Sequence, residues 1–165
     1  MRINVIGMVA ALALVLAACE STSDSGAGAS GTGGSAGAAG ARAMTMAEKF
    51  QVEVGDRVFF AFDKFNIDPD QKKTLDRQAA WLKANNGTTI TVEGHCDERG
   101  TREYNLALGE RRANAVKDYL VVQGINASRI KTVSYGEERP VALGSDETAW
   151  AQNRRAVTVV GGSGS

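Results

Sequence analysis

The sequence is poor in the residues on which enzymes and nucleic-acid-binding proteins depend. Its 19 basic residues are matched by 19 acidic ones, so no net charge draws the chain toward nucleic acid or anionic lipid. It has one histidine, His95, and therefore no second imidazole to complete a metal site or to serve as a general base. We expect no nucleic-acid partner, no metal and no cofactor.

The sequence also lacks an apolar run that would comfortably span a membrane. The candidate run, from Ile3 to Leu16, follows the charged Arg2 and has the length of an export signal rather than that of a transmembrane helix. It ends in Leu16-Ala17-Ala18-Cys19, which resembles a bacterial lipobox. The sequence therefore predicts that residues 1–18 are a lipoprotein signal peptide. The alternative is an ordinary signal peptide that happens to contain a cysteine.

The cysteine of a lipobox becomes the first residue of the mature protein. Its sulfur receives a diacylglycerol and its new amine is acylated, which would give Cys19 three acyl chains. Two or more chains anchor a protein stably, whereas one binds a membrane only marginally. Glu20 stands where an aspartate commonly marks retention in the inner membrane. We therefore expect an anchor in the outer membrane, on its periplasmic face.

Apolar periodicity is missing between Glu20 and about Met44, where Gly, Ala and Ser predominate. Such a segment has no face to bury and behaves as a flexible coil. A coil of about 25 residues spans roughly 25–30 Å on average. We therefore assign residues 19–49 to the lipidated cysteine and a flexible tether, residues 50–160 to a folded domain, and residues 161–165 to a disordered tail.

Strand and helix patterns alternate along the folded part in the order β-α-β-α-β-β. The sequence predicts strands over residues 58–62, 88–94, 130–135 and 156–160, and helices over residues 69–85 and 102–123. This order predicts an α/β domain, a two-layer sandwich in which two main helices pack on a four-stranded sheet. Right-handed crossovers would make the first three strands parallel.

Both predicted helices carry start signals and a core face. Asp68 is placed to cap the first helix, Pro69 suits its first position, and Gln71 would complete a capping box. Thr101 is placed to cap the second helix, and Arg112 lies beside its apolar stripe. Apolar residues three and four positions apart define the core faces: Leu75, Ala79 and Leu82 in the first helix, and Leu106, Gly109, Ala113, Val116 and Leu120 in the second.

Cys96 follows a strand whose residues alternate between two faces. It shares a face with Ile90 and Val92, so we expect a small buried core residue. His95 points to the other face, and the two side chains are therefore poorly placed to hold one metal ion. With Cys19 lipidated, Cys96 also has no disulfide partner in the chain. An enzyme built on this stretch is disfavoured.

The stretch from Gly94 to Ala113 passes from a strand through a short charged loop into a helix. Asp97 lies in the loop, and Arg112 lies about three turns into the helix. If the fold brings them together, they offer an anionic and a cationic group side by side, which suits a small zwitterion. The alternative is a surface salt bridge, which would contribute little to stability.

The same stretch carries a resemblance to a known family. T-I-T-V-E-G-H-C-D-E-R-G-T-R-E-Y-N-L-A-L-G-E-R-R-A resembles the core motif of the OmpA-like peptidoglycan-binding domain family, and F-F-A-F-D-K, Y-G-E-E-R-P and N-R-R-A-V also occur in the expected order. The resemblance covers roughly residues 55–160. It implies a mixed sheet whose last strand runs antiparallel. With the lipobox it extends to the lipid-anchored members of the family, which belong to the Tol–Pal system.

The resemblance also implies a ligand. In the family, the residues that match Asp97 and Arg112 bind the zwitterionic end of meso-diaminopimelate in the stem peptide of peptidoglycan. A carboxylate suits the ammonium group, and a guanidinium fork suits the carboxylate. Further positions that match the family's groove are Asp63, Glu98, Arg99 and Leu108.

The resulting interpretation is a non-enzymatic tether between the outer membrane and the cell wall. The resemblance implies that the partners are peptidoglycan, TolB and other Tol proteins, and that the process is envelope constriction at cell division. Two alternatives remain at this point: a periplasmic protein-binding adaptor, and a cell-wall hydrolase. The hydrolase would need an acid and a base or a metal cluster, and the sequence offers neither in recognisable form.

Overall fold

The computed structural model describes residues 42–161. The predicted signal peptide, Cys19, most of the predicted tether and residues 162–165 lie outside this range. The helices and strands follow one another as α1 (Met46–Lys49), a π-helix (Phe50–Val54), β1 (Arg57–Phe59), α2 (Pro69–Ala84), β2 (Ile90–His95), α3 (Arg102–Val122), a 3-10 helix (Ala127–Arg129), β3 (Ile130–Gly136), α4 (Glu147–Asn153) and β4 (Arg155–Val160).

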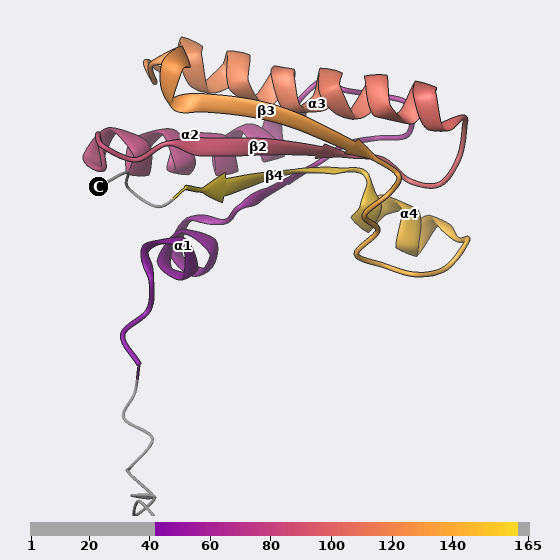
Figure 1. Ribbon diagram of the computed structural model, residues 1–165, viewed down its shortest axis with the longest axis horizontal. Coiled ribbons are helices and arrows are strands. Elements are labelled where there is room, and N and C mark those ends of the chain that lie inside the picture. The colour runs from indigo at the N-terminus through magenta and orange to yellow at the C-terminus, as the bar shows by residue number, and fades with distance from the viewer. Residues whose placement is uncertain (1–41, 162–165) are drawn as a thin grey trace, which may run out of the picture. The chain divides into compact units, whose positions relative to one another are not determined.

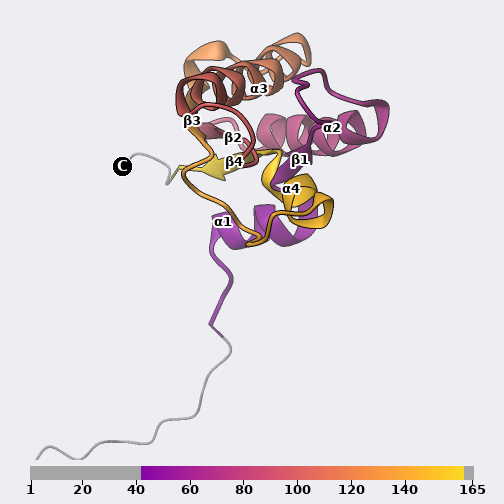
Figure 2. The same cartoon turned by 90° about the vertical axis from the view of Figure 1, so that its right-hand side faces the viewer.

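The four strands form one mixed sheet in the order β1-β4-β2-β3 (Figure 1). Strands β2 and β3 pair in parallel, and β4 lies antiparallel between β1 and β2. The first three strands therefore run in one direction, and the last strand runs against them. Helices α2 and α3 cover one face of this sheet, while α1 and α4 lie on its other side (Figure 2). The predicted fold class and the antiparallel last strand are confirmed.

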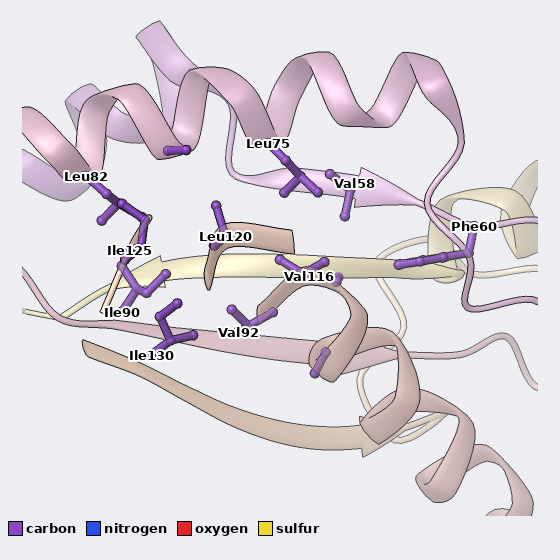
Figure 3. Close-up of a cluster of buried hydrophobic side chains, with 13 residues drawn as sticks. Val58, Phe60, Leu75, Leu82, Ile90, Val92, Val116, Leu120, Ile125 and Ile130 are labelled. Carbon is purple, nitrogen blue, oxygen red and sulfur yellow. The ribbon is translucent and has the colours of Figure 1, made fainter. Parts of the chain in front are cut away.

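The hydrophobic core fills the space between the sheet and the helices α2 and α3 (Figure 3). The predicted face of α2 is confirmed, since Leu75, Ala79 and Leu82 are all buried. Ile90 and Val92 of β2 face the same core, as the strand alternation predicts. Trp81 packs against this cluster from its edge, with its ring 4.8 Å from the ring of Phe50 in an edge-to-face contact.

The predicted core face of α3 is correct at Gly109 and in the second half of the helix, and wrong at Leu106. Ala113, Val116 and Leu120 are buried, but Leu106 is 51% exposed. The buried series in the first half consists of Asn105, Leu108, Gly109 and Arg112. Two of these side chains are polar, which hides the stripe from a count of apolar residues. Arg112 therefore belongs to the buried face and does not lie beside it.

The start of α2 differs from the predicted capping box. Pro69 is its first residue, as predicted, but the Asp68 side chain makes no hydrogen bond to the backbone N–H groups of the helix. The Gln71 side chain instead accepts a hydrogen bond from the backbone N–H of Phe59 (2.9 Å). It thus satisfies a donor at the open edge of β1. At α3 the predicted cap is confirmed, because the Thr101 hydroxyl accepts from Tyr104 N (3.2 Å).

Four short elements are absent from the sequence predictions: α1, the π-helix, the 3-10 helix and α4. Helix α1 starts at Met46, before the expected start of the domain at residue 50, and Thr45 and Glu48 form its capping box. The π-helix and α4 were also not predicted, because elements of five and seven residues show too little periodicity. Strand β1 is shorter than expected and ends at Phe59. Among the described residues, no helix has both the length and the apolar character needed to cross a membrane.

Strand β2 and helix α3 touch backbone to backbone at Gly94 and Gly109. A Cβ atom on Gly94 would lie 1.8 Å from the carbonyl oxygen of Gly109. A Cβ atom on Gly109 would lie 2.3 Å from the Ser134 hydroxyl and 3.0 Å from the carbonyl oxygen of Gly94. Only residues without a side chain allow this approach. It sets how closely the first half of α3 lies against the sheet.

Candidate functional site

Strands β2 and β3 end at the right of Figure 1. The loops at this end of the sheet contribute to the wall of a cavity of about 220 Å³. Its walls come from four parts of the chain: the loop after β1, the loop after β2, the first turns of α3, and the junction of α4 and β4. The lining residues are Phe62, Asp63, Cys96, Asp97, Arg99, Gly100, Tyr104, Asn105, Leu108, Arg112 and Arg154. Because β1 and β2 run in the same direction, the loops that leave them meet at this edge.

Arg112 is the most buried charged residue of the cavity, with 1% of its surface exposed. It donates hydrogen bonds to three backbone carbonyls: from Nε to Lys64 (2.8 Å), from Nη1 to His95 (2.8 Å) and from Nη2 to Ala61 (3.3 Å). Burial lowers the pKa of Arg112 from its ordinary value, but a guanidinium stays protonated. Within residues 42–161 it forms no ion pair. Arg112 thus places a buried positive charge in the cavity wall that is not paired with any carboxylate of the described residues.

Asp97 lines the same cavity, but its charge is already matched. Its Oδ1 accepts from the backbone N (3.1 Å) and Nε (3.2 Å) of Arg99, and its Oδ2 accepts from Arg99 Nη2 (2.7 Å) and Arg154 Nη1 (3.2 Å). Burial alone would raise the pKa of Asp97, but these hydrogen bonds outweigh it and hold the pKa below its usual value. The structure therefore brings Asp97 and Arg112 to one cavity without an ion pair between them.

Arg99 is held over two aromatic rings at the mouth of the cavity. Its Cζ lies 4.1 Å from the ring centroid of Phe62 and 3.9 Å from that of Trp150. The hydrogen bonds to Asp97 raise the pKa of Arg99 above its ordinary value. A second carboxylate, that of Glu147, lies 3.8 Å from Nη2. Arg99 therefore has an alternative partner within reach if a ligand occupies Asp97.

Asp63 contributes a second carboxylate to the cavity. Its backbone is in the left-handed region, with φ of 55°, which turns the chain sharply after β1. The hydroxyl of Tyr104 donates a hydrogen bond to its Oδ1. Its Oδ2 accepts none from the described residues. Unlike Asp97, Asp63 is exposed and retains capacity to accept hydrogen bonds from a ligand.

Two further predicted site residues are placed differently. Leu108 is buried and forms part of the cavity wall. Glu98 does not line this cavity. It lines a neighbouring one of about 250 Å³, which shares only Cys96 with the first, and it accepts a hydrogen bond from Trp150 Nε1 (3.1 Å). Of the six predicted ligand-binding residues, five are brought together and Glu98 is not.

Cys96 is buried, as the strand pattern predicts, with 3% of its surface exposed. Its Sγ lies 3.3 Å from the Asn105 carbonyl oxygen and 3.3 Å from Nη1 of Arg112. Burial raises the pKa of the thiol to about 11, although Arg112 opposes this rise. A thiol with this pKa is protonated at neutral pH and is therefore a poor nucleophile.

His95 is also unsuited to acid–base chemistry in the cavity, because it faces away from it. It is 2% exposed, and its ring stacks on that of Tyr135 at 5.5 Å. Burial, followed by the charges of Arg155, Arg139 and Arg57, lowers the pKa of His95 to about 4. The imidazole is therefore neutral at neutral pH. No group of three or more His, Cys, Asp or Glu side chains within residues 42–161 is arranged to hold a metal ion.

Sequence reasoning missed Arg154 and the aromatic part of the site. Arg154 is 6% exposed and joins three segments, because it donates to the Phe60 carbonyl (3.0 Å), to Asp97 and to Glu147 (2.6 Å). A signal was present, since Arg154 belongs to the motif N-R-R-A-V. Phe62 and Tyr104 also lie in quoted motifs, F-F-A-F-D-K and the core motif, but an exposed aromatic residue in a loop or first helical turn has no periodicity that marks it as part of a site.

The cavity is thus built to bind and not to react. Two carboxylates and three guanidinium groups line it, from Asp63, Asp97, Arg99, Arg112 and Arg154. The only thiol in its wall is protonated, and the histidine nearby points elsewhere. Charges of both signs within so small a volume suit a ligand that carries an ammonium group and a carboxylate.

Comparisons with known proteins agree with this geometry. The sequence profile described as the OmpA family matches residues 59–154. The chain is 60% identical over 117 residues to the peptidoglycan-associated lipoprotein of Agrobacterium fabrum, with 71% of this chain and 66% of that protein covered. It is 57% identical over 119 residues to the protein of the same name from Mesorhizobium japonicum, with 72% and 71% covered. These relatives are named as lipoproteins and not as enzymes, in line with the non-enzymatic interpretation.

Solved structures show the same fold. The peptidoglycan-associated lipoprotein of Burkholderia pseudomallei is 44% identical and superposes with a TM-score of 0.63, over 64% of this chain and 90% of that one. The C-terminal domain of Helicobacter pylori MotB is 22% identical with a TM-score of 0.56, over 63% and 84%. At that identity the likeness concerns the fold alone.

Proposed function

Because the chain belongs to the OmpA family, we propose that its cavity binds the free end of meso-diaminopimelate in the peptidoglycan stem peptide. That end carries an ammonium group and a carboxylate on one carbon. The protein would then hold the cell wall non-covalently and would not modify it. The relatives' name, peptidoglycan-associated lipoprotein, supports the class of ligand.

The observation that carries this proposal is the isolated charge of Arg112. Burial of a guanidinium is costly unless an anion compensates it, and the described part of the chain supplies only carbonyl groups and a thiol. A ligand carboxylate in the cavity would supply the missing negative charge. Most N–H donors of the Arg112 guanidinium already form hydrogen bonds within the protein. The ligand carboxylate would therefore accept a hydrogen bond from the remaining N–H and would be attracted by the positive charge.

The ammonium group of the ligand has two carboxylates to bind. Asp63 retains a free oxygen, whereas Asp97 must first release one of its hydrogen bonds. Arg99 is the side chain best placed to move, since Glu147 offers it a second carboxylate. We therefore propose that Asp63 and Asp97 share the ammonium group, and that Arg99, Leu108 and Arg154 shape the cavity around it.

Titration with two stem peptides tests this function. A lysine-type peptide keeps the ammonium group and lacks the carboxylate, so it would leave Arg112 unpaired. An unpaired buried charge costs at least about 2 kcal/mol, and we expect a preference of roughly thirtyfold or more for the diaminopimelate peptide. Arg112→Lys, which keeps the positive charge and loses the planar guanidinium, should reduce the preference for the diaminopimelate peptide. Asp97→Ala should weaken the binding of both peptides.

The control is the lysine-type peptide itself, measured by calorimetry under the same conditions. Equal affinities of the native protein for the two peptides would refute the proposed ligand. An Arg112→Ala variant that stays folded and keeps the full preference would show that this residue does not bind the carboxylate.

We further propose that Cys19 is lipidated and anchors the chain to the periplasmic face of the outer membrane. The support is the lipobox-like Leu16-Ala17-Ala18-Cys19 and the lipoprotein relatives. Cys19→Ser should remove the acyl chains and release the protein into the soluble periplasmic fraction. Membrane fractionation after removal of the peptidoglycan measures how much of the protein is released. A Cys19→Ser protein that stays with the outer membrane would contradict it.

Membership in the Tol–Pal system, with TolB as a partner and a role in envelope constriction at division, is also a proposal. It is supported by the resemblance to lipid-anchored members of the family. Co-purification of TolB with the tagged, full-length chain tests it, and a chain that captures no TolB from cells that express both proteins would refute it.

A further inference from the structure

We propose that Arg111 forms a second carboxylate-binding position at the rim of the cavity, and that it recognises the free α-carboxylate of the D-glutamate next to diaminopimelate. This inference rests on the proposed function and adds to it a second point of recognition. It assigns a specific role to a residue that lies outside the cavity wall.

Arg111 lies at the rim because two aromatic rings hold it there. Its Cζ is 5.6 Å from the ring centroid of Phe65 and 5.8 Å from that of Tyr104. Tyr104 lines the cavity, and its hydroxyl donates to Asp63, which lines it too. Phe65 and Tyr104 are 46% and 44% exposed. The guanidinium of Arg111 therefore sits beside the mouth of the cavity, on the side of α3.

Arg111 also differs from Arg99, Arg154 and Arg102 in having no acidic partner among the described residues. Arg99 pairs with Asp97, Arg154 with Asp97 and Glu147, and Arg102 with Glu138. Within the described part of the chain, Arg111 takes part in no ion pair. Contacts with the two rings restrict its side chain before any ligand arrives. This lowers the entropy that binding would cost.

The chemistry of the stem peptide places a carboxylate near this position. The D-glutamate is joined through its γ-carboxyl group to the amino group at the linked end of diaminopimelate, so its α-carboxylate remains free. With the opposite, free end of diaminopimelate in the cavity beside Arg112, the linked end must leave through the mouth. The glutamate then lies at the rim, where Arg111 can meet its carboxylate with two parallel hydrogen bonds.

A second carboxylate of the same peptide is the one at its C-terminus. Cross-linking consumes it in the donor stem peptide, which is the one that keeps its diaminopimelate amine free, whereas the glutamate α-carboxylate remains in every unamidated stem peptide. We therefore assign Arg111 to the glutamate. Amidation of the C-terminus of the peptide separates the two sources.

The test uses the full-length lipidated chain in detergent and three diaminopimelate peptides. The first carries D-glutamate, the second carries D-isoglutamine, in which the α-carboxylate is an amide, and the third carries D-glutamate with an amidated C-terminus. We expect the isoglutamine peptide to bind roughly two- to fivefold more weakly at low ionic strength, as for an exposed charge pair. Added salt should shrink the difference. The third peptide should bind like the first.

Arg111→Gln should abolish the difference between the first two peptides while the preference for diaminopimelate over lysine remains. The matched control is Arg102→Gln, which removes an exposed arginine of the same helix that is already paired with Glu138. It should keep the difference. If the native chain binds glutamate and isoglutamine peptides equally, or if amidation of the C-terminus accounts for the loss, the assignment of Arg111 is overturned.

The same measurements distinguish a failure of the role assigned to Arg111 from a failure of the proposed binding of diaminopimelate. A native chain without preference for diaminopimelate over lysine would overturn both, because Arg111 would then have no cavity ligand to extend. A chain with that preference but with no effect of glutamate amidation would overturn only the role of Arg111.

Discussion

Gly94→Ala is expected to destabilise the domain by more than about 3 kcal/mol, beyond the usual range for overpacking. The new methyl group would lie 1.8 Å from the carbonyl oxygen of Gly109, a backbone atom that no rotamer change can move. Strand β2 and helix α3 would have to separate, and the core between them and the cavity wall would open. Urea unfolding followed by circular dichroism measures the loss.

Two glycine variants serve as graded controls. At Gly109 the nearest obstacle is the Ser134 hydroxyl, at 2.3 Å, which can rotate away at the cost of its hydrogen bond to the Leu106 carbonyl. Gly109→Ala should therefore cost less than Gly94→Ala. At Gly87 nothing lies within 4 Å of the new atom, so Gly87→Ala should change stability by less than about 0.5 kcal/mol. A Gly94→Ala protein as stable as Gly87→Ala would refute the close contact.

Arg112→Ala is expected to abolish ligand binding and to lower the free energy of unfolding by about 2 kcal/mol. The backbone carbonyls of Lys64 and His95 would lose the hydrogen bond from Arg112, whereas that of Ala61 would keep the one from the Lys64 N–H (3.2 Å). Each acceptor left without a partner costs roughly 1 kcal/mol or more. The loop after β1 would no longer be fastened to the end of β2. Chemical unfolding and peptide titration on the same sample measure both effects.

Arg129 provides the matched control for this variant. It also donates to three backbone carbonyls, those of Leu82, Asn85 and Thr88, but it does not line the cavity. Arg129→Ala should therefore lower stability to a comparable degree and leave the affinity for diaminopimelate peptide unchanged. If Arg129→Ala also abolished binding, the loss in Arg112→Ala would reflect unfolding and not the site.

Periodicity was sufficient for the large elements of the fold. The alternation around Ile90 and Val92 predicted β2 and the burial of Cys96 correctly. The spacing of Leu75, Ala79 and Leu82 predicted the core face of α2. These elements bury one continuous apolar face, and a local pattern records such a face directly. The same reasoning placed Asp97 at the carboxyl end of a strand, where loops build ligand sites in α/β domains.

The details that escaped prediction depend on contacts between distant residues. Gln71 does not form the predicted capping box, because its side chain accepts a hydrogen bond from the N–H of Phe59, twelve residues earlier. Arg112 is buried because carbonyl groups far away in the sequence meet it, and no local pattern predicts a buried arginine. Asp97 is paired with Arg154 across 57 residues. Sequence spacing reports one element at a time, whereas these bonds join several.

A residue that both binds a ligand and stabilises the fold is under two kinds of selection. Substitution of Arg112 lowers the yield of folded protein even in a cell that gains nothing from the ligand. Exposed positions such as Asp63 and Arg111 carry no such penalty, because few contacts of the fold depend on them. Among descendants of this protein, we therefore expect ligand preference to diverge first at the rim of the cavity, while the arginine at its base persists.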